Sequence, residues 1–376
     1  MSVDLAARFS SLRLLADDMT GALDSAAAFV PVFGPMPVSG ALSDHPTQVL
    51  DSATREVEAE QAAAQVRLLA PFLAPAPGRL SFFKVDSLLR GNAGAELDAI
   101  LERQRFDQVI MANAMPFQGR WTRGGRQVHL RDGVETPTGE DLPHTLPRHG
   151  VKVRFARPTD GVGPGVTLFD CESQADLDAI VRAGLEAAGT TLWVGSGGLA
   201  GALARTMTRD AVPPPAFSGP VLGLIGSQHP TMLAQLRQVE TYVEAVADHG
   251  PATVARIARR LSGARVAFLL CDLPAGMIRS EAHARIDARF AGLVRALEPP
   301  GLLFVSGGET LHSLMLPLHA EALEVVGEIE PGAPVSRLLG GPWRGTLVLS
   351  KSGAFGSEDF LVRLLSRLPP TSKVTA

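Results

Sequence analysis

The hydrophobic pattern of the chain is that of an α/β protein, in which short apolar runs alternate with amphipathic stretches of helical composition. Apolar runs predict strands at residues 12–15, 48–51, 80–85, 108–113, 166–170, 192–195, 221–225, 266–271, 302–305, 323–329 and 346–350. Helices are predicted at 22–29, 56–73, 93–104, 175–188 and 198–207, and from residues 232 and 357 onward. Residues 121–130 predict a hairpin, and 131–150 an irregular loop. This alternation indicates mostly parallel sheets flanked by helices.

A proline-rich stretch at residues 211–220 divides this pattern into two halves. It contains three consecutive prolines, which are typical of a stiff linker. A chain of 376 residues is also longer than one hydrophobic core usually serves. We therefore expect two α/β domains, 1–212 and 213–376.

Adjacent carboxylates end the first predicted strand. Asp17 and Asp18 follow it directly, and Thr20 and Gly21 lead into the first predicted helix. A strand that ends in acids and turns into a helix presents them at the carboxyl edge of a parallel sheet, where α/β proteins bind ligands. The structural alternative is that Asp18 or Thr20 simply caps the helix.

Further charged groups follow the other strands of the first half. Arginine forks suit carboxylates or phosphates, and aspartates accept hydrogen bonds from sugar hydroxyls, so a mixed set suits a small polyhydroxylated acid. Singly, Arg55 and Arg120 are equally compatible with solvated surface charges. The residues in or just after strands, or in the following loops, are Asp51, Arg55, Lys84, Asp86, Arg90 and Arg120.

Glycine-containing loops follow three strands of the second half. Glycine lets backbone amides approach an anion, and a helix N-terminus adds free N–H groups, so three such loops at one sheet edge predict a nucleotide site. Each loop alone is equally compatible with an ordinary tight turn. The P-loop pattern is absent from the sequence. The loops lie at 226–231, 307–310 and 351–356.

One glycine stretch fits a different cofactor. Residues 195–200 match the G-x-G-x-x-A pattern of dinucleotide-binding proteins, between a predicted strand and a predicted helix. The next strand, however, lacks the acid that would bind the ribose. Close helix–strand packing is the better explanation, and an NAD-dependent dehydrogenase is kept as an alternative.

Composition narrows the class of protein. The formal net charge of −4 does not favour binding to nucleic acid or to an anionic membrane. No apolar stretch of the sequence is long enough to span a membrane. Two distant cysteines suit a reducing compartment, and no histidine pair has zinc-site spacing. We expect a cytoplasmic protein that binds small molecules.

Five motifs, taken in order, resemble the four-carbon acid sugar kinases, a family once known only as a domain of unknown function. The resemblance extends from about residue 12 to residue 360. One departure is Leu88, where the family usually has threonine. The motifs are LADDMTGA at 15–22, KVDSLLRGN at 84–92, Gly226-Ser227 with Thr231, GGET at 307–310 and KSGAFG at 351–356.

The resemblance implies an ATP- and Mg²⁺-dependent kinase with its active site in a cleft between a sugar-acid domain and a nucleotide domain. It would phosphorylate the C4 hydroxyl of threonate, erythronate or a 3-oxo-tetronate. A non-catalytic sugar-acid-binding paralogue remains an alternative, and a homodimer is compatible with the sequence. The implied roles are Asp17 and Asp18 as catalytic residues; Arg55, Lys84, Asp86, Ser87 and Arg90 at the substrate; and Ser227, Thr231, Gly307, Gly308, Glu309, Thr310 and Gly353 at the nucleotide.

Overall fold

The chain forms two compact units, Met1–Val212 and Pro213–Ala376, in a computed structural model. Residues 8–131, 133–208, 213–274 and 276–369 are described. Each unit has its own hydrophobic core and is treated separately below, with the paired strands inside each unit described as that unit's sheet.

The first unit is built on a parallel sheet with the strand order β2-β3-β1-β4-β11-β5-β10-β9. Its central strands are buried along their whole length because helices cover both faces. The strands are β1 (Ser11–Ala16), β2 (Met36–Ser39), β3 (Gln48–Asp51), β4 (Arg79–Lys84), β5 (Gln108–Ala112), β9 (Val153–Ala156), β10 (Gly165–Phe169) and β11 (Thr191–Gly195).

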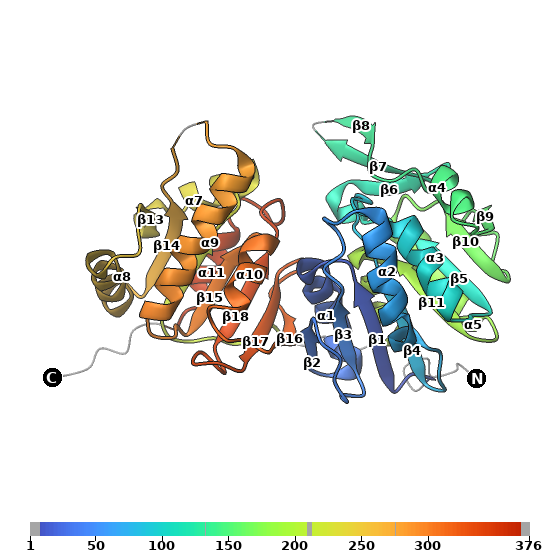
Figure 1. Ribbon diagram of the computed structural model, residues 1–376, viewed down its shortest axis with the longest axis horizontal. Helices are drawn as coiled ribbons and strands as arrows, with labels where there is room; N and C mark the ends of the chain where they lie inside the picture. The colour runs from blue at the N-terminus through green and yellow to red at the C-terminus, as the bar shows by residue number, and fades with distance from the viewer. Residues whose placement is uncertain (1–7, 132, 209–212, 275, 370–376) are drawn as a thin grey trace. The chain divides into compact units, whose positions relative to one another are not determined.

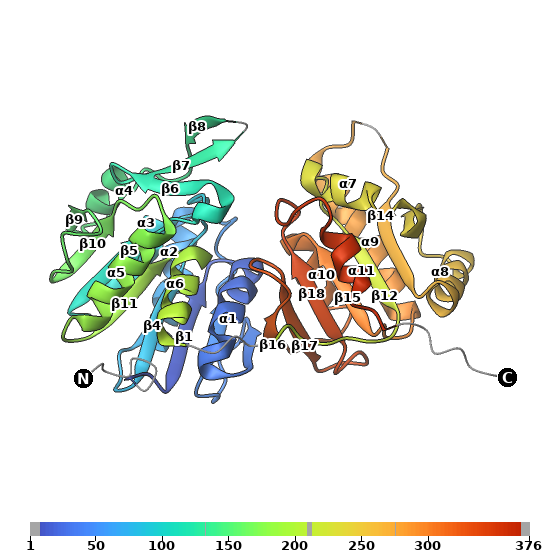
Figure 2. The ribbon, with the colours of Figure 1, turned by 180° about the vertical axis from the view of Figure 1, so that it is seen from behind.

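Helices lie on both faces of this sheet (Figures 1 and 2). One layer packs α1 on α6 and α6 on α5, and the other packs α2 on α3 and α3 on α4. The helices are α1 (Met19–Phe33), α2 (Ala59–Leu69), α3 (Ala93–Arg103), α4 (Leu142–Arg148), α5 (Gln174–Glu186) and α6 (Gly197–Met207), with 3₁₀ turns η2 (Ala70–Leu73) and η3 (Pro116–Gln118).

A small antiparallel sheet is added to the first unit, in the order β6-β7-β8. The predicted hairpin is confirmed by β6 (Arg120–Arg123) and β7 (Arg126–Arg131), which turn at two glycines in left-handed conformation. The predicted irregular loop at 131–150 is wrong in part, because β8 (Val134–Pro137) pairs with β7 and α4 follows. Both elements are short and carry polar or exposed residues, so no hydrophobic period marks them.

The second unit has the strand order β13-β14-β12-β15-β18-β17-β16. The first five are parallel, and β17 and β16 are antiparallel at one side. The sequence did not predict β17, which begins directly after a proline-containing turn. The strands are β12 (Val221–Ile225), β13 (Val243–Val246), β14 (Val266–Cys271), β15 (Leu302–Ser306), β16 (Ala322–Glu328), β17 (Pro334–Leu339) and β18 (Leu347–Lys351).

Helices also cover both faces of the second sheet (Figures 1 and 2). One layer holds α9 against α10, and the other holds α7 against α11. The helices are α7 (Pro230–Arg237), α8 (Pro251–Gly263), α9 (Arg279–Ala296), α10 (Gly308–Met315) and α11 (Phe360–Ser366), with a 3₁₀ turn η4 (Glu240–Tyr242). The mostly parallel, two-domain α/β fold predicted from the sequence is confirmed.

Each sheet has a point where the chain switches direction. Strand β1 lies between β3 and β4, and β12 lies between β14 and β15. Loops that leave neighbouring strands on opposite sides of such a point diverge and leave a crevice at the carboxyl edge, where α/β proteins bind ligands. The polar motifs of both halves follow these strands.

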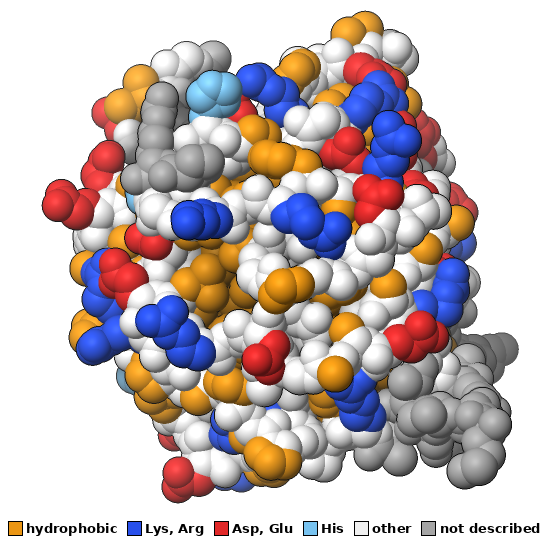
Figure 3. Space-filling model, turned by 90° about the vertical axis from the view of Figure 1, so that its right-hand side faces the viewer, with side chains coloured by type: hydrophobic (Ala, Val, Ile, Leu, Met, Phe, Trp, Pro, Cys, Tyr) orange, Lys and Arg blue, Asp and Glu red, His pale blue; other side chains and the backbone are white. Residues whose placement is uncertain are grey.

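Charges of both signs are mixed on one face of the first unit. On the face of the first unit in Figure 3, Lys and Arg side chains are interspersed with Asp and Glu. Among the described residues, no helix is long and apolar enough to span a membrane.

Candidate functional site

A buried ion pair joins the loops that follow β1 and β3. Arg55 donates from Nε to Asp17 Oδ2 at 2.9 Å and from Nη2 to Asp17 Oδ1 at 2.7 Å. Although burial alone lowers the pKa of Arg55, Asp17 and Asp18 raise it above its ordinary range. Burial raises the pKa of Asp17, and Arg55 opposes that rise. Both oxygens of Asp17 are therefore occupied by the arginine fork.

Asp18 has a different environment from its neighbour. Its Oδ1 lies 2.6 Å from Arg55 Nη2 and accepts the backbone N–H of Gly21 at 2.8 Å, so it caps α1. Asp18 therefore caps the helix, as the structural alternative predicted, and also forms an ion pair with Arg55. The Asp18 side chain is 23 % exposed, whereas that of Asp17 is 4 % exposed. Of the two carboxylates, Asp18 is the one that a ligand can reach.

The loop after β4 adds a second acid–arginine pair. Arg90 Nε and Nη2 donate to Asp86 Oδ2 and Oδ1 at 2.8 and 2.7 Å, and Asp86 Oδ1 also lies 3.7 Å from Arg55 Nη2. Burial raises the pKa of Asp86, but Arg90, Arg55 and Lys84 outweigh it and hold the pKa well below its usual range. The Arg90 side chain is 58 % exposed, so part of the guanidinium faces solvent.

Lys84 ends β4 with its ammonium group buried among these carboxylates. Nζ donates to the Val85 carbonyl at 2.9 Å, and its charge acts on Asp17 and Asp86. Gly21 makes room for this arrangement, because a Cβ built there would lie 2.7 Å from both Asp18 Oδ1 and Lys84 Nζ. A side chain at this position would displace both charged groups.

Side chains from the segment after β5 and from strands β6 and β7 form hydrogen bonds to the loop at residues 86–90. Arg120 Nη1 donates to Ser87 Oγ, and Asn113 Nδ2 donates to the Asp86 carbonyl at 3.0 Å. Gln127 Nε2, on β7, donates to the Ser87 carbonyl at 2.7 Å. The structure thus brings together all seven substrate-side residues predicted from the sequence: Asp17, Asp18, Arg55, Lys84, Asp86, Ser87 and Arg90.

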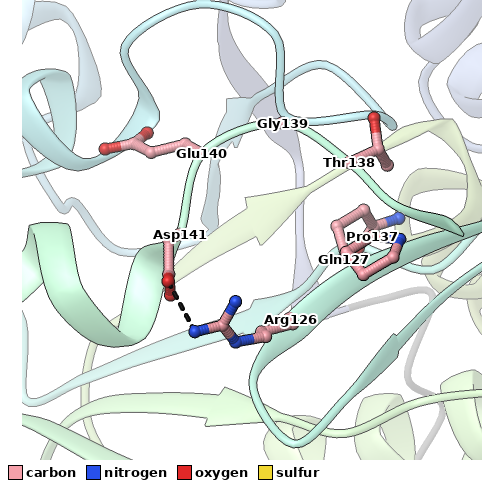
Figure 4. A pocket seen from close by; sticks show the side chains of 7 residues that line it. All are labelled: Arg126, Gln127, Pro137, Thr138, Gly139, Glu140 and Asp141. Carbon is pink, nitrogen blue, oxygen red and sulfur yellow. Dashed lines mark ion pairs between the residues drawn. The ribbon is translucent and has the colours of Figure 1, made fainter.

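The small antiparallel sheet backs this loop through a tight backbone contact. A Cβ at Gly139 would lie 1.9 Å from the Leu88 carbonyl oxygen, and Glu140 N donates to the Leu89 carbonyl at 2.9 Å. Beside it lies a pocket of about 140 Å³, lined by residues 126–127 and 137–141, in which Arg126 pairs with Asp141 (Figure 4). The hydrophobic pattern of the sequence could not predict this contact, because it is made by a turn rather than by a helix or strand.

The three glycine loops of the second unit lie against one another. A Cβ at Gly353 would lie 1.8 Å from Ser227 Oγ, and one at Gly226 would lie 1.8 Å from Thr310 Oγ1. Gly307 has φ +115° and donates its N–H to the Lys351 carbonyl at 3.1 Å. The loops after β12, β15 and β18 therefore interlock through contacts that require glycine.

Two helices begin at these loops. His229 caps α7 by accepting the Thr231 backbone N–H on Nδ1 at 3.2 Å, and its own N–H donates to Ser227 Oγ at 3.2 Å. Gly308 and Glu309 open α10, whose Thr310 is buried against Gly226. Glu309 contacts His283 Nδ1 of α9, so its carboxylate is directed toward that helix. The predicted nucleotide-side residues are brought together, apart from the Glu309 side chain.

Two side chains organise the loop after β18: Lys351, which opens the motif identified in the sequence, and Gln235, which sequence reasoning missed. Lys351 Nζ, buried, donates to the carbonyls of Ser352 and Phe355 at 3.1 and 2.8 Å. Burial lowers the pKa of Lys351 to about 8, and Glu330 opposes that shift. Gln235 Nε2, on α7, donates to the carbonyls of Phe355, Gly356 and Ser357. Hydrogen bonds from Lys351 and Gln235 thus fix the carbonyls of this loop.

The dinucleotide-like stretch serves helix–strand packing. A Cβ at Gly195 would lie 2.2 Å from the Ala112 carbonyl, and one at Gly198 would lie 2.1 Å from the Ala114 carbonyl. Ser196 is fully buried and donates to the Ala114 carbonyl at 2.9 Å. These glycines lie against protein backbone, as close helix–strand packing requires, which disfavours the dehydrogenase alternative.

Comparison with known proteins matches each unit to a domain family. Residues 12–147 match the family of sugar-binding N-terminal domains, and residues 222–361 match that of nucleotide-binding C-terminal domains. The glycine loops and the acid–arginine cluster thus lie in a nucleotide-binding and a sugar-binding module respectively. This combination defines a two-domain α/β phosphotransferase.

Relatives along the full length identify the family. The chain is 30 % identical to a D-threonate kinase of Bordetella bronchiseptica, with 93 % of this chain and 95 % of the relative covered. It is 26 % identical to a D-erythronate kinase of Heliobacterium modesticaldum, with 93 % and 95 % covered. A Salmonella typhimurium structure described as a putative tRNA synthase shares the fold, with a TM-score of 0.71, 22 % identity, and 94 % of this chain and 98 % of that chain covered. The chain belongs to the four-carbon acid sugar kinase family, as its motifs predicted.

Proposed function

We propose that this protein is an ATP-dependent kinase that phosphorylates the C4 hydroxyl of a four-carbon sugar acid of the threonate, erythronate or 3-oxo-tetronate type. The observation that carries the proposal is the meeting of Asp18, Arg55, Lys84 and Asp86 at the switch point of the first sheet. The names of the full-length relatives support the substrate class.

The charges of the first unit suit a small acid with several hydroxyls. Arg90, with its exposed guanidinium, and Arg55 are the cations proposed to bind the substrate carboxylate. Lys84 balances the surrounding carboxylates, while Asp86 is proposed to accept hydrogen bonds from substrate hydroxyls and Ser87 to accept from or donate to them. Arg55 is held on two sides by Asp17 and Asp18, so its orientation is set before the ligand arrives.

Asp18 is the proposed base. Its exposure supports this role, because Asp17 has both oxygens committed to Arg55. As the C4 oxygen forms its bond to the γ-phosphorus, its proton passes to Asp18 and the bond from phosphorus to the ADP oxygen breaks. Phosphoryl transfer depends mainly on positioning and charge neutralisation, so the base makes one contribution among several.

The second unit is proposed to bind ATP with Mg²⁺. Backbone N–H groups of the loops at Ser227, Gly307 and Gly353, with the starts of α7 and α10, suit phosphate oxygens. Among the described residues, no cluster of three acidic, histidine or cysteine side chains is arranged to hold a metal. This fits a magnesium ion bound chiefly through nucleotide phosphates, where it would neutralise charge developing on the transferred group. The two buried free cysteines support the proposal that the enzyme works in the cytoplasm.

A coupled ADP-release assay tests the function. We expect ATP- and Mg²⁺-dependent turnover with at least one of D-threonate, D-erythronate and their 3-oxo forms, and a product phosphorylated at C4 by ³¹P NMR. Folded protein that binds a tetronate but releases no ADP would instead be a sugar-acid-binding paralogue. Folded protein that neither binds nor turns over any tetronate would refute the substrate class.

A further inference from the structure

The loop at residues 86–90 has a backbone conformation that its own sequence does not favour. Leu89 has a φ of +52°, which a non-glycine residue rarely adopts. Its N–H donates to the Asp86 carbonyl at 2.8 Å, and the N–H groups of Leu88 and Arg90 donate to Asp86 Oδ2 at 3.0 and 3.2 Å. Because these amides turn inward to Asp86, the carbonyls of the loop need partners from other segments.

A turn at residues 138–141, directly after β8, supplies such partners. Glu140 donates its backbone N–H to the Leu89 carbonyl at 2.9 Å. A Cβ at Gly139 would lie 1.9 Å from the Leu88 carbonyl oxygen and 2.5 Å from that of Leu89, so the approach requires glycine. The turn thus holds the backbone just before the arginine of this loop.

The same turn holds the chain where α3 begins. The side chain of Asn92, the residue before the helix, donates to the Val57 carbonyl at 2.8 Å and forms no capping hydrogen bond among the described residues. Glu140 Oε2 instead accepts the backbone N–H of Gly94 at 2.9 Å. A carboxylate is favourable there because it meets free N–H groups and the positive end of the helix dipole. Glu140 therefore holds the chain on both sides of Arg90, with its backbone before it and with its side chain after it.

The small antiparallel sheet fixes the position of the turn. The Thr138 N–H donates to the Gln127 carbonyl at 2.9 Å. The side chain of Gln127 is 1 % exposed and donates to the Ser87 carbonyl of the loop at 2.7 Å. Arg126 and Asp141 pair at 2.8 Å beside the pocket that the turn lines (Figure 4). The sheet, the turn and the loop are thus joined by hydrogen bonds.

We infer that Gly139 and Glu140 are positioning residues, which hold Asp86 and Arg90 in the geometry that binds the sugar acid. The inference rests on the proposed function, in which Arg90 binds the substrate carboxylate. The loop needs this support because a residue with the φ of Leu89 persists only where its surroundings hold it. The β6-β7-β8 sheet thereby takes part in substrate binding through the turn that follows it.

Gly139→Ala tests the backbone contact. The new methyl group would overlap the Leu88 carbonyl and push the turn away from the loop, so we expect the KM for D-threonate to rise at least about tenfold. The KM for ATP should keep its wild-type value, because the proposed nucleotide loops belong to the other unit. Gly124→Ala, between β6 and β7, is the matched control. Its φ of +58° is close to the +68° of Gly139, but its Cβ would meet no described atom within 4 Å, so it should keep the wild-type KM for D-threonate.

A pair of variants tests the side-chain contact. Glu140→Ala loses the acceptor for the Gly94 N–H, so we expect the Kd for D-threonate in calorimetric titration to rise about fivefold, as the loss of one helix cap shifts an equilibrium. Glu140→Gln keeps an acceptor oxygen and should recover most of that loss. Equal KM for D-threonate in Gly139→Ala and Gly124→Ala, or wild-type Kd in Glu140→Ala, would overturn the inference. If Gly139→Ala does not fold, the two Glu140 variants decide.

Hydrogen exchange separates a failure of this inference from a failure of the proposed function. In the ligand-free protein, the amides of peptide 84–92 should exchange faster in Gly139→Ala and Glu140→Ala than in the wild type and in Gly124→Ala, because the loop loses its support. If the wild type binds no tetronate, the proposed function fails, and this comparison alone decides the positioning role. Wild-type exchange of the peptide in both variants would refute it.

Discussion

At the scale of single residues, Asp17 and Asp18 are neighbours in sequence with opposite surroundings. Asp17 is buried and accepts both hydrogen bonds of the Arg55 fork, whereas Asp18 caps a helix through Oδ1 and is the more exposed of the two. The alternation of side chains at a strand end accounts for this division, because consecutive residues leave the strand in different directions. Their substitutions should therefore have different effects.

Asp18→Asn should lower kcat about 10²- to 10⁴-fold, the usual contribution of a general base, with a smaller loss of stability than Asp17→Asn, because asparagine also caps helices. Asp17→Asn should lower the free energy of unfolding by about 3 kcal/mol, because it removes the buried carboxylate that accepts both hydrogen bonds of the Arg55 fork. Steady-state ADP release and urea unfolding measure the two effects. Wild-type kcat in folded Asp18→Asn would exclude that residue as the base.

Gly21 offers a second test at this scale. In Gly21→Ala the new methyl group would lie 2.7 Å from both Asp18 Oδ1 and Lys84 Nζ, so we expect kcat/KM for the sugar acid to fall at least about tenfold, as misplacement of reacting groups by a fraction of an ångström does. Gly201→Ala, inside α6, meets only the flexible end of Arg205 and is the matched control. Equal activity of the two variants would mean that the cluster tolerates displacement.

At the scale of elements, the loop at residues 351–357, proposed to bind phosphate, is held by hydrogen bonds to its carbonyls. Lys351 and Gln235 together donate hydrogen bonds to the carbonyls of four of its residues. These residues are Ser352, Phe355, Gly356 and Ser357. A peptide whose carbonyl faces inward turns its N–H the other way, so this anchoring favours outward amides. If the loop binds phosphate as proposed, this arrangement is in place before the anion binds.

Gln235→Met tests that arrangement, because methionine keeps the volume and loses three hydrogen bonds. We expect the Kd for ATP to rise about tenfold, equivalent to about 1.4 kcal/mol, with the Kd for D-threonate unchanged. Gln238→Met, exposed at the end of the same helix, should behave as wild type. Tighter or unchanged ATP binding in Gln235→Met would show that the loop needs no such anchor.

The elements also show what the sequence could predict and what it could not. Strand ends with charged or glycine-rich successors were identified correctly, because a buried strand is a continuous apolar run and its polar end is conspicuous. Strands β2, β8, β9, β13 and β17 and helix α4 were missed, because they are short and follow turns or polar stretches. Helices α8, α9 and α10 were not predicted either.

The supporting residues were missed for a different reason. Gln127 in a predicted hairpin looks like part of a solvated face, and Gln235 has no distinguishing neighbours in the sequence. Their burial becomes apparent only when the other elements are in place. The residues of the candidate site that directly follow strands could therefore be predicted from the sequence. The buried side chains that support these residues could not.

At the scale of the whole molecule, each unit has a separate core and a separate set of ligand contacts. The first core is centred on residues such as Leu15, Leu50 and Phe83, and the second on Val221, Phe304 and Leu349. A ligand stabilises the native state by about 2.7 kcal/mol at a hundred times its Kd. That stabilisation should be concentrated in the loops that contact the ligand.

Hydrogen exchange on the intact protein can therefore assign each ligand to its unit. D-Threonate alone should slow exchange in the first unit, because it orders the loops that hold Asp18, Arg55 and Arg90. ATP with Mg²⁺ alone should slow exchange in the loops that hold Ser227, Gly307 and Gly353. Protection by ATP of the first set, or by D-threonate of the second, would reverse the assignment. The peptides to follow are 14–24, 50–57 and 84–92 for the acid, and 224–232, 305–311 and 350–357 for the nucleotide.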